Sequence, residues 1–328
     1  MIKKIITLVI IALVVMTYNK DILNQVKHII NYKNNIEESY VDKKLNDNIS
    51  IDNFKYIKIG DSEDSVINKI GNPSRKDVSE YNYSWYVYNQ YEGKFAMVGI
   101  ENNEVVALYS NTINSCESEN INLYDSKDSV NNQYESLEYR TKGNTRYIID
   151  SNGEYDIIKV NKKYITVFYD VIEDSKVCSY QIISQKTEDS MSDIYTSGSE
   201  ELQKSFELEI IDLINSSREK FNLNALEYSK EATNSSRNHS EDMLENNYFD
   251  HTNKNGESPF DRMQQEGINY ISAGENIASG QFNAIYAHEA LMNSKGHRKN
   301  ILGDYKYIGV GVKFGGKYKI YYTENFYT

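Results

Sequence analysis

The chain has 328 residues, of which 39% are hydrophobic and 26% are charged, so it can form about two globular domains and is not disordered throughout. Its net charge of −12 argues against a surface for nucleic acid or anionic lipid, because both require a basic face. We therefore expect no nucleic-acid partner.

Residues 1–20 are typical of a membrane-targeting segment. Lys3 and Lys4 precede an apolar run at residues 5–16, which is shorter than the about 17–25 residues of a full span. Its length fits the apolar region of a signal peptide, but no small-residue cleavage site follows it. This favours an uncleaved signal anchor, which is a single span of the cell membrane with its lysines on the cytoplasmic side and the following domains extracytoplasmic. A cleaved, secreted form and a buried N-terminal core helix are the alternatives.

A charged, Asn-rich stretch at residues 21–52 is predicted to be a stalk, and residues 53–184 a small α+β domain of two repeats, about 57–112 and 121–183. The helix start Asp61-Ser62-x-Asp64-Ser65-Val66 recurs 64 residues later, at residues 125–130. Strand-like runs follow each copy, at residues 83–88, 95–100 and 105–109, and at residues 146–150, 155–160, 164–169 and 177–183.

The last strands of the two copies match at Val106 and Cys178, which are 72 residues apart, so the second copy carries a longer strand region. We predict a tandem duplication of a helix followed by an antiparallel meander. Chance similarity between stretches rich in Asp and Ser is the alternative. Asn102-Asn103 is expected to form the turn between the last two strands of the first copy.

The chain has two cysteines, Cys116 and Cys178. An even number in an extracytoplasmic chain can indicate a disulfide. The bridge would close a loop of 62 residues and contribute at most about 4 kcal/mol to stability. Two unrelated buried thiols are the alternative.

Residues 185–202 are polar and rich in turn residues, and they are predicted to be a linker. A second domain is predicted at residues 203–328. Its first helix carries apolar residues from Leu208 to Phe221, a second places His239 and Met243 on one buried face, and a third covers residues 283–293. His288, on the third helix, is expected at the surface. Two strands, residues 307–314 and 318–326, form a hairpin at paired glycines, which gives a layered α+β domain.

Five motifs occur in order in this second domain, at residues 247–252, 273–278, 293–302, 308–311 and 323–326. They read NYFDHT, AGENIA, NSKGHRKNIL, IGVG and TENF. In this order they resemble the bacterial branch of the CAP superfamily, named for cysteine-rich secretory proteins, antigen 5 and pathogenesis-related 1 proteins. The resemblance implies an α-β-α sandwich with an open cleft. Residues 53–184 are similar, more weakly, to the CAP-associated N-terminal domain, through Ile59-Gly60-Asp61-Ser62 and Gly71-Asn72-Pro73.

The resemblance implies a cleft with two histidines and two glutamates, of which His251, Glu275 and His297 match three. Ser294 stands at the position of the second glutamate, as is common in the bacterial branch, and this removes one carboxylate. We expect all four residues to converge on one water-accessible pocket, with Ser294 capping a short helix that His297 opens.

Two neutral imidazoles and a carboxylate can bind zinc and leave a position for water. We therefore predict zinc as a tentative cofactor, with His251 and His297 as ligands and Glu275 as the candidate base. The separations of 24 and 22 residues are not those of a short metal motif, and an architectural role for Glu275 is the alternative.

Three functions are compatible with this sequence. The first is a module that binds a cell-envelope component, a lipid or a protein, as the family resemblance implies. The second is a metal-assisted hydrolase, protease-like or esterase-like, in which Glu275 activates water. The third is a structural envelope or spore-associated protein with a vestigial cleft. No Gly-x-Ser-x-Gly elbow is present to support a nucleophilic mechanism, so the sequence favours binding over catalysis.

Overall fold

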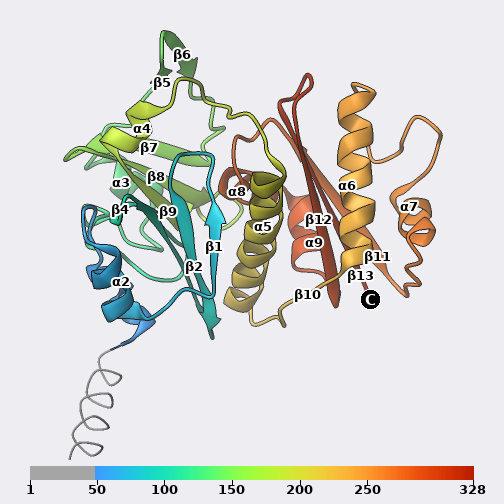
Figure 1. The fold of residues 1–328 in the computed structure, drawn as a ribbon, viewed down its shortest axis with the longest axis horizontal. Helices are drawn as coiled ribbons and strands as arrows, with labels where there is room; N and C mark the ends of the chain where they lie inside the picture. The colour runs from blue at the N-terminus through green and yellow to red at the C-terminus, as the bar shows by residue number, and fades with distance from the viewer. Residues whose placement is uncertain (1–48) are drawn as a thin grey trace, which may run out of the picture. The chain divides into compact units, whose positions relative to one another are not determined.

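The computed structural model describes residues 49–328, and residues 50–328 form one compact unit (Figure 1). The predicted signal anchor and nearly all of the predicted stalk, within residues 1–48, lie outside the described residues. Among residues 49–328 no helix is long and apolar enough to cross a bilayer. The compact unit begins just before the predicted boundary at residue 53, because Ile51 is already buried in the core.

A seven-stranded antiparallel sheet forms the N-terminal half of this unit. Its spatial order is β1 (Arg75–Val78), β2 (Ser84–Tyr91), β3 (Lys94–Glu101), β4 (Glu104–Ser110), β9 (Lys176–Ser184), β8 (Lys163–Asp170) and β7 (Tyr155–Val160). Asn102 and Asn103 join β3 to β4 with φ of 50° and 67°, the left-handed conformation that a two-residue hairpin turn needs. The pairing of β4 with β9 joins the two proposed repeats into one sheet.

The two proposed repeats make matching hydrogen bonds. In the first, Gly60 N donates to Val105 O and Val105 N donates to Asp61 O, each at 2.8 Å. In the second, Tyr124 N donates to Val177 O at 2.8 Å and Val177 N donates to Asp125 O at 2.9 Å. The helices α2 (Glu63–Ile70) and α3 (Lys127–Asn131) follow, each with a serine as its N-cap. This match supports the proposed duplication and its offset of 72 residues in the last strand. The hairpin of β5 (Tyr139–Lys142) and β6 (Thr145–Ile148) lies within the longer second copy.

Hydrophobic clusters cover both faces of the seven-stranded sheet. On one face, Phe54 of η1 (Ile51–Tyr56) and Val66 of α2 pack against strand residues such as Leu108. On the other face, Trp85 and Tyr109 pack against Leu213, Ile285 and Tyr286, which belong to the C-terminal half of the unit. The two halves therefore share a hydrophobic core.

The C-terminal half is an α-β-α sandwich around a four-stranded sheet, as predicted. The strand order is β10 (Glu227–Tyr228), β12 (Tyr307–Phe314), β13 (Ile320–Tyr327) and β11 (Ala273–Ser279). One layer holds α5 (Glu200–Lys220), α8 (Ala284–Met292) and α9 (Lys295–Ile301), and the other holds α6 (Lys230–Glu245) and α7 (Pro259–Gln265). A Cβ at Gly309 would lie 2.1 Å from Thr233 N, so α6 can approach the sheet closely only over glycine. In Figure 1, α5 lies between the two sheets.

The predicted linker is partly helical and partly buried. Its helix α4 (Gln185–Ser190) places the Glu188 carboxylate against Arg140 and Lys142 of the β5–β6 hairpin, and Lys142 Nζ lies 2.8 Å from it. Burial opposes the charge, but Arg140 and Lys142 outweigh it and bring the pKa of Glu188 to about 2. The sequence pattern did not predict α4, because this helix is held in place by charged groups and not by an apolar face.

The predicted disulfide is wrong, because Cys116 and Cys178 are both free thiols. The backbone N–H of Cys116 donates to Lys55 O, on the face of the sheet that η1 covers. The Cys178 thiol donates to Glu289 Oε2 of α8 at 3.3 Å, on the opposite face. The sheet therefore separates the two sulfur atoms.

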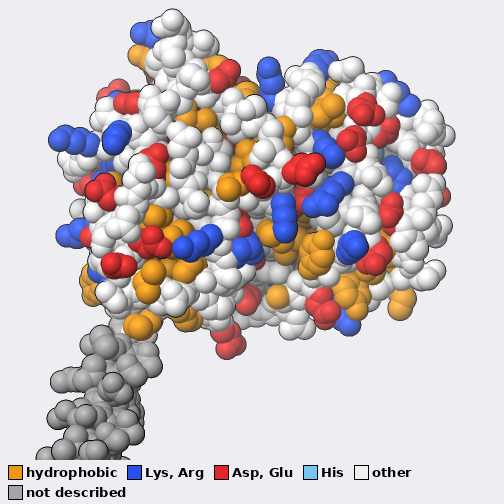
Figure 2. Space-filling view, viewed as in Figure 1, with side chains coloured by type: hydrophobic (Ala, Val, Ile, Leu, Met, Phe, Trp, Pro, Cys, Tyr) orange, Lys and Arg blue, Asp and Glu red, His pale blue; other side chains and the backbone are white. Residues whose placement is uncertain are grey.

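The surface charge is mixed, and Figure 2 shows acidic and basic side chains interspersed over the face that it draws.

Candidate functional site

Three structural elements carry the candidate site. His251 lies in the loop between α6 and α7, Glu275 lies on β11, and His297 lies in the first turn of α9. The structure brings His251 and Glu275 into contact, with 2.9 Å between Nδ1 and Oε1. His297 is tied to the same strand, because Asn276 Nδ2 donates to His297 O at 3.2 Å.

Both oxygens of the Glu275 carboxylate are engaged. Oε1 contacts His251, Oε2 accepts a hydrogen bond from Arg262 Nη2 at 2.8 Å, and the side chain is 1% exposed. Arg262 also donates to His251 O at 2.9 Å and to Glu257 O at 3.0 Å. One guanidinium therefore fixes both the carboxylate and the backbone that carries the histidine. The contact with Glu275 orients His251 so that its Nε2 is the nitrogen left for a ligand.

His239 supports the loop that carries His251. As predicted, it is fully buried on α6, and its Nε2 lies 3.0 Å from Asp250 O. Nε2 also lies 3.9 Å from Glu275 Oε1, and burial lowers the pKa of His239, so its imidazole is held toward the neutral form. The residue thus positions the segment that carries His251.

Two asparagines join β11 to α9. Asn300 Nδ2 donates to Glu275 O at 3.1 Å and to Asn276 Oδ1 at 2.9 Å. Ser294 occupies the N-cap of α9, as predicted, but its side chain makes no capping hydrogen bond. Ser294 lies three residues before His297, at the start of the same helix.

The two site histidines have opposite pKa shifts. The hydrogen bond to Glu275 raises the pKa of His251, against a smaller opposing effect of burial. Burial lowers the pKa of His297, and the positive charge of His251 lowers it further. The site therefore offers a half-exposed ring that tends to be cationic beside a ring that tends to be neutral.

A metal ion would find few ligands here. Residues 49–328 contain no group of three or more His, Cys, Asp and Glu side chains arranged to hold a metal. Glu275 is already bound by Arg262 and His251, whereas a catalytic zinc site supplies three protein ligands. Zinc binding by His251 and His297 stays a prediction, and the carboxylate of Glu275 is already engaged within the protein.

Several residues that support the site were not predicted from the sequence. They are Arg262, Asn276 and Asn300, although all three lie in or beside the motifs that resemble the family. The signal for Arg262 was the sequence Ser258-Pro259, which starts α7 with a capping box and places Arg262 one turn later. The prediction for His288 is wrong, since its side chain is buried between α8 and α5, with Nε2 2.8 Å from Ser217 Oγ.

Comparisons with known proteins cover both halves of the unit. The family model for the cysteine-rich secretory protein family matches residues 211–326, and the model for the CAP-associated N-terminal domain matches residues 59–193. The chain is 32% identical over 291 residues to the uncharacterized membrane protein YlbC of Bacillus subtilis. This alignment covers 82% of each chain. It is 45% identical over 107 residues to the uncharacterized protein YkwD of the same organism, covering 32% of this chain and 42% of that protein.

Two solved structures share the fold. An extracellular protein containing an SCP domain from Bacillus anthracis has a TM-score of 0.70 and 24% identity, covering 85% of this chain and 95% of its own. A cysteine-rich secretory protein from Staphylococcus aureus has a TM-score of 0.67 and 16% identity, covering 82% and 91%. Together with the ordered motifs and the relative that spans most of its length, these matches show that the chain belongs to the cysteine-rich secretory protein (CAP) family and carries a CAP-associated N-terminal domain.

Proposed function

We propose that this protein is membrane-anchored and extracytoplasmic, and that it binds a cell-envelope component, a lipid or a protein in the cleft of His251 and His297. The N-terminal lysines and apolar run support the anchor. The relative named as a membrane protein and the solved structures named as extracellular or secretory support the location.

The observation that carries the proposal is the state of Glu275. A general base needs an oxygen within reach of the proton that it removes. Both oxygens of Glu275 instead accept hydrogen bonds within the protein, and the side chain is almost fully buried. Glu275 therefore acts as a positioning residue for His251, and the groups offered to a ligand are the two imidazoles. This favours binding over metal-assisted hydrolysis.

Capture by envelope material tests the proposal. The full chain, purified in detergent, is mixed separately with cell-wall sacculi, with lipid vesicles and with membrane-protein extract, and the bound fraction is measured by sedimentation or pull-down. We expect one of the three to retain the protein. Replacing His251 and His297 with alanine should weaken that capture by about tenfold or more, as for loss of hydrogen bonds to a charged group.

The matched control is Lys230→Ala, which changes an exposed residue at the start of α6 and leaves the cleft intact. Equal capture of the parent and the double histidine variant would mean that His251 and His297 take no part in the binding. Turnover of a peptide or ester panel that Glu275→Gln abolishes would instead support the hydrolase.

A further inference from the structure

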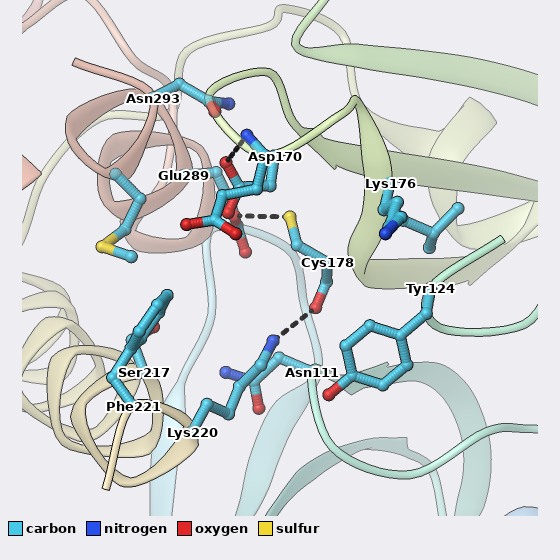
Figure 3. Close-up of a pocket in the computed structure, with 13 residues that line it drawn as sticks. Asn111, Tyr124, Asp170, Lys176, Cys178, Ser217, Lys220, Phe221, Glu289 and Asn293 are labelled. Atoms are coloured by element: carbon cyan, nitrogen blue, oxygen red, sulfur yellow. Dashed lines mark hydrogen bonds between the residues drawn. The ribbon is translucent and has the colours of Figure 1, made fainter. Parts of the chain in front are cut away.

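A pocket lies away from His251 and His297, where the two halves of the unit meet. Its cavity of about 270 Å³ is bounded by β9 and neighbouring loops of the N-terminal half and by α5 and α8 of the C-terminal half (Figure 3). None of His251, Glu275 or His297 lines it. At about 30 Å³ per water molecule, the cavity has room for a ligand the size of an amino acid derivative.

Lys220, the last residue of α5, brings a positive charge to this pocket. Its ammonium donates a hydrogen bond to Cys178 O at 3.1 Å and lies 5.9 Å from the centre of the Tyr124 ring. Within residues 49–328, no carboxylate lies within ion-pair distance of Lys220. The Lys220 ammonium can therefore donate to a further acceptor in the cavity.

The carboxyl groups around the pocket are already occupied. Asp170 lies 2.7 Å from Arg298 and Glu173 lies 3.6 Å from the same guanidinium. Glu289 accepts hydrogen bonds from Ser179 at 2.5 Å and from the Cys178 thiol at 3.3 Å. Burial raises the pKa of Glu289, which holds this carboxyl toward its neutral form. Lys220 thus has no ion-pair partner among these acids, although its charge partly offsets the effect of burial on the pKa of Glu289.

A second donor and an apolar wall accompany Lys220. Asn111 is 3% exposed, and its Oδ1 accepts a hydrogen bond from Ser216 at 2.8 Å, which leaves its NH₂ group for a ligand. Tyr124 and Phe221 are 66% and 39% exposed, unusually high for large aromatic side chains, and they stand on either side of Lys220 in Figure 3. Met292 adds apolar surface to the lining of the pocket.

We infer that this pocket between the two halves binds a small carboxylate with an apolar or aromatic body, such as an N-acylated amino acid. The carboxylate accepts from Lys220 and from the Asn111 amide, and the apolar body packs between Tyr124 and Phe221. A charge-assisted hydrogen bond inside a partly closed pocket supplies the specificity, and the aromatic rings supply the buried area.

The test uses N-acetyl-L-phenylalanine and its amide, which differ only in the terminal group: a charged carboxylate in the acid and a neutral carboxamide in the amide. Binding to the full chain in detergent is measured by calorimetry and by the shift in melting temperature. We expect the acid to bind about tenfold more tightly than the amide, as for a hydrogen bond to a charged group.

Two substitutions separate charge from packing. Lys220→Met keeps the length of the side chain and should weaken binding of the acid by about tenfold or more, whereas Lys220→Arg keeps the charge and should retain binding. Lys204→Met, an exposed lysine on the same helix, is the matched control and should change nothing. The variant without His251 and His297 should bind the acid as the parent does, because it alters a different site.

The inference is overturned if the acid and the amide bind equally, if neither binds at millimolar concentration, or if Lys220→Met binds the acid as tightly as the parent. The comparison of acid with amide uses only the parent protein, so it decides the matter even if a substitution at Lys220 loosens the contact between the halves.

Discussion

The carboxylate of Glu275 is held between a guanidinium and an imidazole, and this arrangement leaves Nε2 as the ring nitrogen of His251 that Glu275 does not contact. The family resemblance identified His251, Glu275 and His297, but the role of Glu275 depends on Arg262, which no spacing rule connects to it. Sequence motifs therefore predicted that His251 and Glu275 meet, whereas the hydrogen-bonding state of the carboxylate required the structure.

Replacing Glu275 with glutamine should test its positioning role. The variant keeps the shape but leaves Arg262 buried without its counter-charge, so we expect the free energy of unfolding to fall by about 3 kcal/mol. Removing the hydrogen bond that raises the pKa of His251 should also bring that pKa back toward 6.5, as measured by NMR titration.

The sign of the accompanying pH effect follows from the raised pKa of His251. The His251–Glu275 contact contributes stability that is fully present below about pH 6.5 and is lost as pH rises through the folded-state pKa. Glu275→Gln should remove that dependence. Glu257→Gln, at a more accessible carboxylate nearby, is the control and should leave the His251 titration unchanged. An unaltered His251 pKa in Glu275→Gln would contradict the positioning role.

The predicted binding of zinc depends on two individual residues, His251 and His297. Ligating imidazoles must be neutral, so the uptake of Zn²⁺ should weaken as pH falls. Because the pKa of His251 is raised, this weakening should begin above the ordinary value of about 6.5. Calorimetry at several pH values measures it, and His251→Ala with His297→Ala should abolish the uptake. Zinc binding that survives the double substitution would place the metal elsewhere.

At the scale of helices and strands, periodic patterns predicted most of the C-terminal half. The buried face of α6, with His239 and Met243, and the β12–β13 hairpin follow from spacing and from Gly315-Gly316 alone. The prediction failed for His288, because α8 packs against both halves and has little exposed face. A single helix pattern cannot show that another helix, here α5, covers the face that carries His288. For a similar reason the sequence did not predict α4, whose contacts with the rest of the protein are made by charged side chains.

The α4 helix should be essential to the β5–β6 hairpin. Glu188→Ala would leave Arg140 and Lys142 buried without their counter-charge, and we expect a loss of about 3 kcal/mol or more in unfolding free energy. Hydrogen exchange should show lost protection first in residues 139–148. The control is Asp189→Ala on the same helix, where the carboxylate is exposed. Equal stability of both variants would mean that the buried cluster does not hold the hairpin.

At the scale of the whole molecule, the described halves share one core, in which Trp85 and Tyr109 of one half pack against Leu213 and Tyr286 of the other. The sequence analysis treated the halves as separate domains on either side of a linker. It could not detect the shared core, because the residues that meet there are far apart in the chain and each lies in an ordinary amphipathic pattern.

Unfolding of residues 50–328 should therefore be one cooperative transition. Trp85 is the chain's single tryptophan and is 1% exposed in the shared core, so its fluorescence reports on the N-terminal half. The NMR signals of His239 report on the C-terminal half. Denaturant midpoints from the two probes should coincide. Two separated midpoints would show that the halves unfold independently and that the shared core adds little stability.

The most direct measurement of the cleft's function is an NMR titration of the full chain, labelled with ¹⁵N at its histidines, with solubilised envelope fragments that capture the protein. We predict that the imidazole signals of His251 and His297 shift as the ligand is added, while those of the buried His239 and His288 change little. Binding that leaves both cleft imidazoles unchanged would contradict the account and place the ligand on another surface.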